Sequence, residues 1–273
     1  MNILLIKAII LGIVEGLTEF LPISSTGHLI LVGDLLNFNN ETGKLFELVI
    51  QTGAVLAICW EYRLKINSVI KGLLLQEASA KRFSLNLIIA FMPLASFGFL
   101  FGHWIKAHLF KPIPVALAFI IGGLIIFWAE KRQHQITISA VEQLTPMDAL
   151  KLGLAQAFAL IPGTSRAGAT IVGGLFLGLS RKAATEFSFF LAIPTLIVAG
   201  LYDLYKHAAL LQLKDLPLFI VGLIAAFLSA LIAIRALLRY ISQHSFIVFA
   251  IYRILFGLIV ILTAYSGWVQ WSI

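Results

Sequence analysis

Charged residues are scarce in this chain of 273 residues. They make up 12% of it, whereas hydrophobic residues make up 60%. A soluble domain usually carries about a quarter charged residues. The deficit extends along the whole chain, which argues against a soluble second domain and indicates a polytopic membrane protein. We therefore predict a single membrane domain over residues 1–273.

Cysteine is nearly absent. The one cysteine, Cys59, excludes an intramolecular disulfide, and its apolar surroundings indicate a small side chain used in helix packing. A cleavable signal peptide is not expected either, because Glu15 and Glu19 interrupt the apolar run Met1–Phe20 and no small-residue cleavage pattern follows. We expect this segment to remain in the mature protein.

Anionic residues are outnumbered by cationic ones. The chain has 20 Lys and Arg and 13 Asp and Glu, which gives a net charge of +7. No basic-aromatic motif of a nucleic-acid-binding protein is present, so we expect no nucleic-acid partner. In a chain this apolar, the excess charge indicates loop cations beside anionic lipid headgroups.

Six apolar stretches are long enough, at about 17–25 residues, to cross a bilayer as helices, although the first is marginal. The predicted spans lie near Leu45–Trp60, Ser84–Ile105, Ile113–Ala129, Ala184–Tyr205, Leu216–Leu237 and Phe246–Ser266.

Two other apolar regions are interrupted by polar turns. Ile3–Leu36 is broken by Pro22 and the run Ser24-Ser25-Thr26-Gly27, and Ala149–Leu179 is broken by Pro162-Gly163-Thr164-Ser165-Arg166. Backbone exposed to lipid cannot be left without hydrogen bonds, so such turns must be buried in protein or face water. We predict two re-entrant helix-turn-helix hairpins.

The two interrupted regions resemble each other. Gly12-Ile-Val-Glu15 corresponds to Gly153-Leu-Ala-Gln156, and the two turns align with one inserted residue. Three spans follow each hairpin, which predicts an internal repeat near residues 1–140 and 141–273. Because a hairpin returns to its own side and three spans change sides, the repeat must be inverted. Interrupted segments at matching positions of inverted halves indicate the binding site.

Loop charge predicts the orientation. Placing the loop near 61–82 in the cytoplasm puts ten cations there and leaves five outside, in agreement with the positive-inside rule. The inner set is Arg63, Lys65, Lys71, Lys81, Arg82, Lys131, Arg132, Arg181, Lys182 and Arg239, and the outer set is Lys44, Lys106, Lys111, Lys206 and Lys214. Both termini then face outward.

Glu15 and Glu19 lie four residues apart and share one face of a helix. Two carboxylates in an apolar segment repel each other and need a cation, a metal ion or a shared proton. A structural role, with hydrogen bonds to the other half, is the alternative. Because ionisable groups within a membrane are functional by default, we predict a site for a divalent cation.

Ser24, Ser25, Thr26 and His28 fall where the first turn enters its second half-helix. The free N–H groups of a helix N-terminus suit a phosphate, although at least one of these hydroxyls is expected to serve only as a helix cap. A hydroxyl three residues before a histidine also suggests a nucleophile and its base. We predict Ser25 and His28 in these roles.

The second turn offers a similar set of groups. Arg166 carries a permanently charged guanidinium whose paired N–H groups fit the oxygens of a phosphate, and Thr170 shares its helix face. An ion pair between Arg166 and a glutamate is the structural alternative. The predicted phosphate-binding residues are Ser24, Thr26, Gly163, Thr164, Ser165, Arg166 and Thr170.

Other polar residues are given supporting roles. Gln51-Thr52-Gly53 is expected to line the same cavity, and Arg235, Arg239 and Arg253 are expected to extend to a membrane interface.

Two segments of the chain resemble known signature motifs. Glu15-Gly-Leu-Thr-Glu19-Phe-Leu-Pro-Ile-Ser-Ser-Thr-Gly-His28 and Pro162-Gly-Thr-Ser-Arg166-Ala-Gly-Ala-Thr170 are similar to the two motifs of bacterial undecaprenyl-diphosphatases of the bacitracin-resistance type. The resemblance covers nearly the whole chain. The second motif has Ala167 where many members carry serine.

This resemblance implies an activity and a setting. It implies hydrolysis of undecaprenyl diphosphate to the monophosphate, which recycles the lipid carrier of cell-wall synthesis, and a requirement for a divalent cation such as Mg²⁺ or Ca²⁺. It implies bacitracin resistance, since that antibiotic sequesters the same lipid, and a bacterial inner-membrane location with the site open to the periplasmic side. Glu15, Glu19, Ser25, His28, Ser165, Arg166 and Thr170 match the family's functional positions.

Two questions stay open from the sequence. The nucleophile could be Ser25, His28 or a water activated by metal, and the oligomeric state is not determined, with a homodimer as one option. The sequence also leaves an alternative function open. Inverted repeats with broken helices are typical of secondary transporters. The alternative function is therefore a transporter or flippase of a lipid-linked or anionic substrate.

Overall fold

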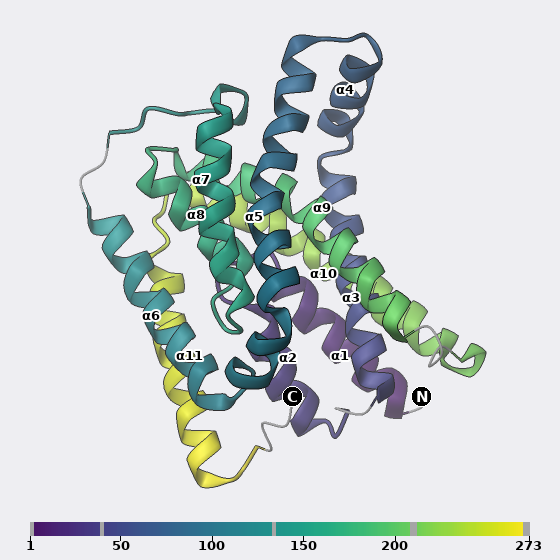
Figure 1. The fold of residues 1–273 in the computed structure, drawn as a ribbon. Helices are drawn as coiled ribbons and strands as arrows, with labels where there is room; N and C mark the ends of the chain where they lie inside the picture. The colour runs from purple at the N-terminus through teal and green to yellow at the C-terminus, as the bar shows by residue number, and fades with distance from the viewer. Residues whose placement is uncertain (1–2, 39–40, 133–134, 208–211, 270–273) are drawn as a thin grey trace.

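The described part of the chain is built almost entirely of helices (Figure 1). The computed structural model describes residues 3–38, 41–132, 135–207 and 212–269. The helices are α1 (Ile3–Thr18), α2 (Ser25–Leu35), α3 (Glu41–Glu61), α4 (Arg63–Leu74), α5 (Ala78–Leu109), α6 (Pro112–Lys131), α7 (Pro146–Ala157), α8 (Arg166–Phe176), α9 (Arg181–His207), α10 (Leu216–Ile241) and α11 (Ile247–Ser266). Short 3-10 turns cover Val141–Gln143, Phe158–Leu160 and Leu213–Asp215.

Five of these helices are long and apolar enough to cross a membrane: α5, α6, α9, α10 and α11. A sixth span follows if α3 and α4, which meet at a bend of 74°, count as one. The six predicted stretches fall in α3, α5, α6, α9, α10 and α11, with Phe246 one residue before the start of α11 and α5 extending beyond both ends of Ser84–Ile105. The prediction of an all-α, multi-pass membrane protein is confirmed.

The chain breaks in both regions where the sequence predicts it. The first break separates α1 from α2 and the second separates α7 from α8, so that each region forms two half-length helices that contact each other. Ser24 and Ser165 precede α2 and α8, with φ of 67° and 70°, a conformation that non-glycine residues rarely adopt. Re-entry into a membrane by these hairpins remains a prediction, which the two matching turns support.

The helices of the two predicted halves pack in an exchanged manner. The α1 helix packs on α10 of the other half, and the corresponding helix α7 packs on α5. A glycine allows each contact, because a methyl group added at Gly12 would lie 2.5 Å from the carbonyl oxygen of Gly222, and one at Gly153 would lie 2.5 Å from that of Ala90. This packing is consistent with the predicted repeat.

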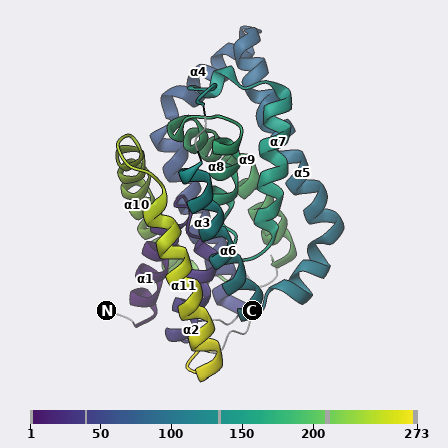
Figure 2. The ribbon, with the colours of Figure 1, turned by 90° about the vertical axis from the view of Figure 1, so that its left-hand side faces the viewer.

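The remaining contacts support the cavity described below. The α3 helix contacts α9 near the middle of the molecule, and α6 packs along α11 (Figures 1 and 2). The start of α1 and the end of α11 lie at the lower end in Figure 1, and α4 lies at the upper end. The described helices thus separate the 61–82 segment from the two terminal helix ends, as the predicted orientation requires.

Candidate active site

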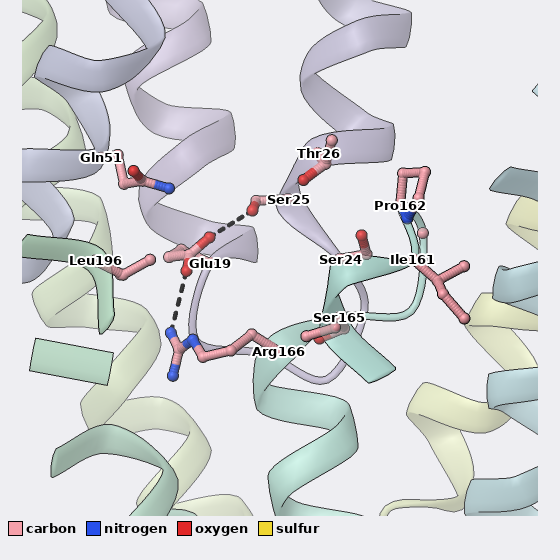
Figure 3. Close-up of a pocket in the computed structure, with 12 residues that line it drawn as sticks. Glu19, Ser24, Ser25, Thr26, Gln51, Ile161, Pro162, Ser165, Arg166 and Leu196 are labelled. Carbon is pink, nitrogen blue, oxygen red and sulfur yellow. Dashed lines mark hydrogen bonds and ion pairs between the residues drawn. The ribbon is translucent and has the colours of Figure 1, made fainter. Parts of the chain in front are cut away.

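A cavity of about 130 Å³ lies where the two interrupted turns meet. Its walls come from both turns, from the first residues of α2 and α8, and from one side chain each of α3 and α9 (Figure 3). The lining residues are Glu19, Ser24, Ser25, Thr26, Gln51, Ala159, Ile161, Pro162, Gly163, Ser165, Arg166 and Leu196. Seven predicted site residues therefore come together in one cavity, and Gln51, alone of its predicted run, joins them.

Glu19 lies between Ser25 and Arg166 (Figure 3). One carboxylate oxygen accepts a hydrogen bond from Ser25 Oγ, and the other lies 3.0 Å from Arg166 Nη2. The side chains of Glu19 and Arg166 are only 7% and 8% exposed, so this ion pair interacts with little screening by water. The arrangement sets a hydroxyl beside a carboxylate that can accept its proton, and places a guanidinium on the other side.

The two turns present the N-termini of α2 and α8 to the cavity. Ser165 caps its helix, with Oγ accepting a hydrogen bond of 3.0 Å from the backbone N–H of Gly168. Ser24 makes no such bond with its side chain, so its hydroxyl is not used as a helix cap. Two helix N-termini that point at one cavity favour an anion there.

Thr170 links the main chain of Arg166 to Ser188. Its hydroxyl is 2.6 Å from the hydroxyl of Ser188 and 2.9 Å from the carbonyl oxygen of Arg166. The carbonyl of Ser188 in turn accepts a hydrogen bond of 3.0 Å from Arg166 Nη1. Thr164 lies on a neighbouring groove. Neither threonine lines the cavity, and their role in binding phosphate stays a prediction.

His28 lies outside the cavity, on the side of α11. Its Nδ1 is 2.7 Å from the carbonyl oxygen of Ser24, and its Nε2 is 2.6 Å from the hydroxyl of Tyr252. Because a carbonyl only accepts, Nδ1 donates to Ser24 and Nε2 accepts from Tyr252. Phe256 stacks on the ring, with 4.1 Å between centroids. The structure thus pairs Ser25 with Glu19 and not with His28, which differs from the predicted nucleophile and base.

Arg253 on α11 joins the two turns. Its side chain is fully buried, and its guanidinium donates to the carbonyl oxygens of Pro22 at 3.1 Å and Gly163 at 2.9 Å. A further 3.0 Å bond reaches the carbonyl of Ala118 on α6. The expectation that Arg253 extends to a membrane interface is wrong, because main-chain carbonyls within the protein satisfy its donors. Arg239, by contrast, is exposed.

Replacing Arg253 with methionine is expected to destabilise the protein and to abolish most activity. The change leaves buried carbonyls without donors, at a cost of about 1–3 kcal/mol for each one, and releases the two turns from each other. Thermal unfolding in detergent would measure the first effect, and the assay described under the proposed function would measure the second. Arg239→Met is the control on the neighbouring helix and should change neither. An Arg253→Met variant with normal unfolding and turnover would contradict this role.

Glu15 is the residue that fits a bound cation. Its side chain is buried, and neither carboxylate oxygen has a hydrogen-bond partner in the described part of the chain. The Glu19 carboxylate is close enough to repel it, and Gln156 stands at the matching place of the other half. Among the described residues no group of three His, Cys, Asp or Glu side chains could hold a metal on its own. Two carboxylates completed by phosphate oxygens are, however, a set of ligands that Mg²⁺ accepts.

Residues 8–259 match the family model described as bacitracin resistance protein BacA. The chain belongs to this family. It is 64% identical over 270 residues to the undecaprenyl-diphosphatase of Dechloromonas aromatica, covering 99% of this chain and 98% of that protein. It is 64% identical over 269 residues to the undecaprenyl-diphosphatase of Nitrosospira multiformis, covering 98% of each. Identity to undecaprenyl-diphosphatase 2 of Rhodospirillum rubrum is 62% over 271 residues, with 99% and 98% covered.

The match to the bacitracin-resistance family includes the whole cavity. Every lining residue, from Glu19 to Leu196, lies within the matched range, and so does Arg253. The similarity therefore extends to the two turns and to the helix that joins them, and it is not confined to the membrane-spanning helices.

Proposed function

We propose that this protein hydrolyses undecaprenyl diphosphate to undecaprenyl phosphate and phosphate. The observation that carries the proposal is the Ser25–Glu19–Arg166 arrangement in an anion-binding cavity between two helix N-termini. The names of the relatives supply the substrate. Removal of the terminal phosphate recycles the lipid carrier of cell-wall synthesis.

The terminal phosphate would be held by the N–H groups at the starts of α2 and α8 and by the guanidinium of Arg166. In the structure Arg166 bonds to Glu19 and to the carbonyl of Ser188, while its Nε has no partner in the described chain. A guanidinium has five N–H groups, and those of Nη1 and Nη2 that do not bond to Glu19 or Ser188 would be offered to oxygens of the substrate. Because the guanidinium is held by the Ser188 carbonyl and the Glu19 carboxylate, little reorganisation is needed as charge develops on the phosphate.

Ser25 is the proposed nucleophile. Its Oγ attacks the terminal phosphorus, its proton passes to the Glu19 carboxylate, and the bond from phosphorus to the bridging oxygen breaks, so that undecaprenyl phosphate leaves. Water then attacks the phosphoserine and releases phosphate. His28 would position the turn through the Ser24 carbonyl, with Tyr252 holding its ring.

A divalent cation, Mg²⁺ or Ca²⁺, is the proposed cofactor. Glu15 and Glu19 would hold it, and when bound it would neutralise negative charge on the diphosphate. The buried carboxylate of Glu15, which lacks a partner in the described chain, supports this assignment.

Glu19→Gln is expected to lose hydrolysis and the response to cations together. The amide keeps the shape of the side chain but removes the charge that a hard cation and a serine proton require. Hydrolysis and thermal unfolding, each measured with and without Mg²⁺ or Ca²⁺, would report on both. Glu61→Gln is the matched control, since Glu61 pairs with Arg235 and does not line the cavity. A cation response equal to that of the wild type would show that Glu19 is not a ligand.

The setting of the enzyme is also proposed. Cationic loop residues support a bacterial inner-membrane protein whose cavity opens to the periplasmic side. Bacitracin would compete by sequestering the lipid diphosphate substrate, so that faster hydrolysis confers resistance. Bilayer lipids surround the helices, and a homodimer is the proposed assembly, which cross-linking in native membranes would test.

Phosphate release by the purified protein in detergent tests the function directly. The enzyme is expected to release one phosphate from each undecaprenyl diphosphate without a second compartment. A transporter or flippase, which the exchanged packing of the halves also suits, would release none. Absence of release in the presence of Mg²⁺ and Ca²⁺ would favour that alternative.

A further inference from the structure

A groove of about 650 Å³ lies beside the cavity, between α6 and the second interrupted region. We call it the α6–α8 groove. One wall is formed by Pro114, Leu117, Ile121 and Ile125 of α6, and the other by residues of α7, the second turn and α8. In Figures 1 and 2 the α6 helix runs alongside α11, with α7 and α8 to one side.

The lining of the groove is almost entirely hydrocarbon. Phe158, Val172 and Phe176 complete the wall opposite α6, and the polar contributions come from Thr164 and from Arg253 at the base. Arg253 is already bonded to main-chain carbonyls, so it offers little to a polar ligand. Such a lining recognises a hydrocarbon chain and cannot satisfy the hydrogen bonds of a polar ligand.

The groove adjoins the phosphate cavity. Ile161 lines both, and Thr164 and Gly168 of the groove flank Ser165 and Arg166 of the cavity. A molecule whose phosphate lies against Arg166 therefore meets the end of the groove across one turn of the chain. Because the two spaces share a wall, one molecule could place its head group in the cavity and its apolar tail in the groove.

The groove is also long and open toward the surroundings. The stretch from Pro114 to Ile126 of α6 is about 18 Å long at the helical rise of about 1.5 Å per residue. Its rim is exposed, since Leu117, Ile121 and Phe158 are 47%, 52% and 64% exposed. A tail could therefore enter from the bilayer sideways, without passing through a closed channel.

We propose that the α6–α8 groove binds the first isoprene units of the lipid substrate while its diphosphate occupies the cavity. This proposal rests on the proposed function, and it adds the site that recognises the prenyl part of the substrate. The rest of the chain remains in the bilayer. Binding to the tail holds the terminal phosphorus near Ser25, so the groove contributes to affinity for prenylated substrates and not to the chemical step.

Two matched substitutions on α6 test the groove. Ile121 and Leu124 are 52% and 55% exposed, but only Ile121 lines the groove. Ile121→Trp is expected to raise KM for undecaprenyl diphosphate by about tenfold, with kcat unchanged and the KM for pyrophosphate, which has no prenyl tail, within about twofold of wild type. Leu124→Trp should leave all these values near wild type. Equal effects of the two variants on the long substrate would overturn the proposal.

A cross-linking experiment on the wild-type protein gives a readout that needs no turnover. An undecaprenyl diphosphate analogue with a diazirine in its second isoprene unit should label peptides of α6 and α8, and excess undecaprenyl diphosphate should suppress the labelling. Labelling of α3 or α10 instead would overturn the proposal. Labelling suppressed equally by bilayer phospholipid would also overturn it, since the groove would then hold ordinary acyl chains. Correct labelling without any phosphate release would reject the proposed hydrolysis and leave the groove intact.

Discussion

Arg166→Ala is expected to lower kcat/KM for undecaprenyl diphosphate by at least about a thousandfold, the size of effect that a charge-stabilising arginine has in phosphoryl transfer. The substitution removes the only cation that lines the cavity in the described chain and leaves Glu19 without its ion-pair partner. Arg166→Lys should also be poor. An ammonium group cannot bond to Glu19 and to the Ser188 carbonyl while presenting a third N–H in the same plane to the phosphate.

A control separates loss of chemistry from loss of folding. Arg181 forms a two-point ion pair with Glu130, with distances of 2.9 and 2.5 Å, and does not line the cavity. Arg181→Lys should therefore lower the temperature of unfolding but keep turnover, whereas Arg166→Lys should lose turnover with a smaller change in unfolding. Turnover of Arg166→Lys at the wild-type rate would remove Arg166 from the proposed mechanism.

Ser25→Ala is expected to be close to inactive, because it deletes the oxygen that would form the bond to phosphorus. Ser24→Ala, one residue earlier in the same turn, should be milder, since its hydroxyl has no defined role as a cap or as a partner of Glu19. His28→Ala should reduce activity by loosening the Ser24 turn. Added imidazole should not restore it, because His28 accepts from Tyr252 and does not face the cavity.

Rapid quench with substrate labelled in its terminal phosphate distinguishes the three candidate nucleophiles. A Ser25 nucleophile gives an acid-stable, base-labile phosphoenzyme, which the Ser25→Ala variant lacks. An acid-labile phosphoenzyme mapped to His28 would contradict the mechanism. Direct attack by water would give no labelled protein at all, and substantial activity in Ser25→Ala would accompany it.

Much of the architecture was predictable because a membrane imposes it. Apolar length marks the spans, and polar turns within apolar runs at Pro22 and Pro162 mark the breaks, since lipid offers no hydrogen bonds to exposed backbone. Spacing alone also placed Glu19, Ser25 and Arg166 at helix ends. What the sequence could not show is that one carboxylate contacts both of the other side chains, because residues 19 and 166 meet only in the folded chain.

The contributions of α11 were not predictable. Tyr252, Arg253 and Phe256 lie in an apolar helix with no recognisable motif, and a lone arginine near a helix end normally reads as an interfacial cation. Only the fold brings these side chains to the two turns, where they bond to His28 and to the carbonyls of Pro22 and Gly163. The contacts of the His28 side chain could not be predicted for the same reason. The position of a residue along a helix does not identify which neighbouring helix its side chain will face.

The exchanged packing of the halves has a consequence for biosynthesis. The α1 helix, which starts at Ile3, docks on α10, which starts at Leu216, so its partner emerges only after most of the chain has been made. Contacts between segments so distant in sequence form late and slow the folding of a chain. The segment that carries Glu15 and Glu19 therefore remains incompletely packed while the following helices insert. The cavity can close only when the last helix, which carries Arg253, has arrived to bind both turns. The order of synthesis thus delays the assembly of the candidate active site until the last helices have been made.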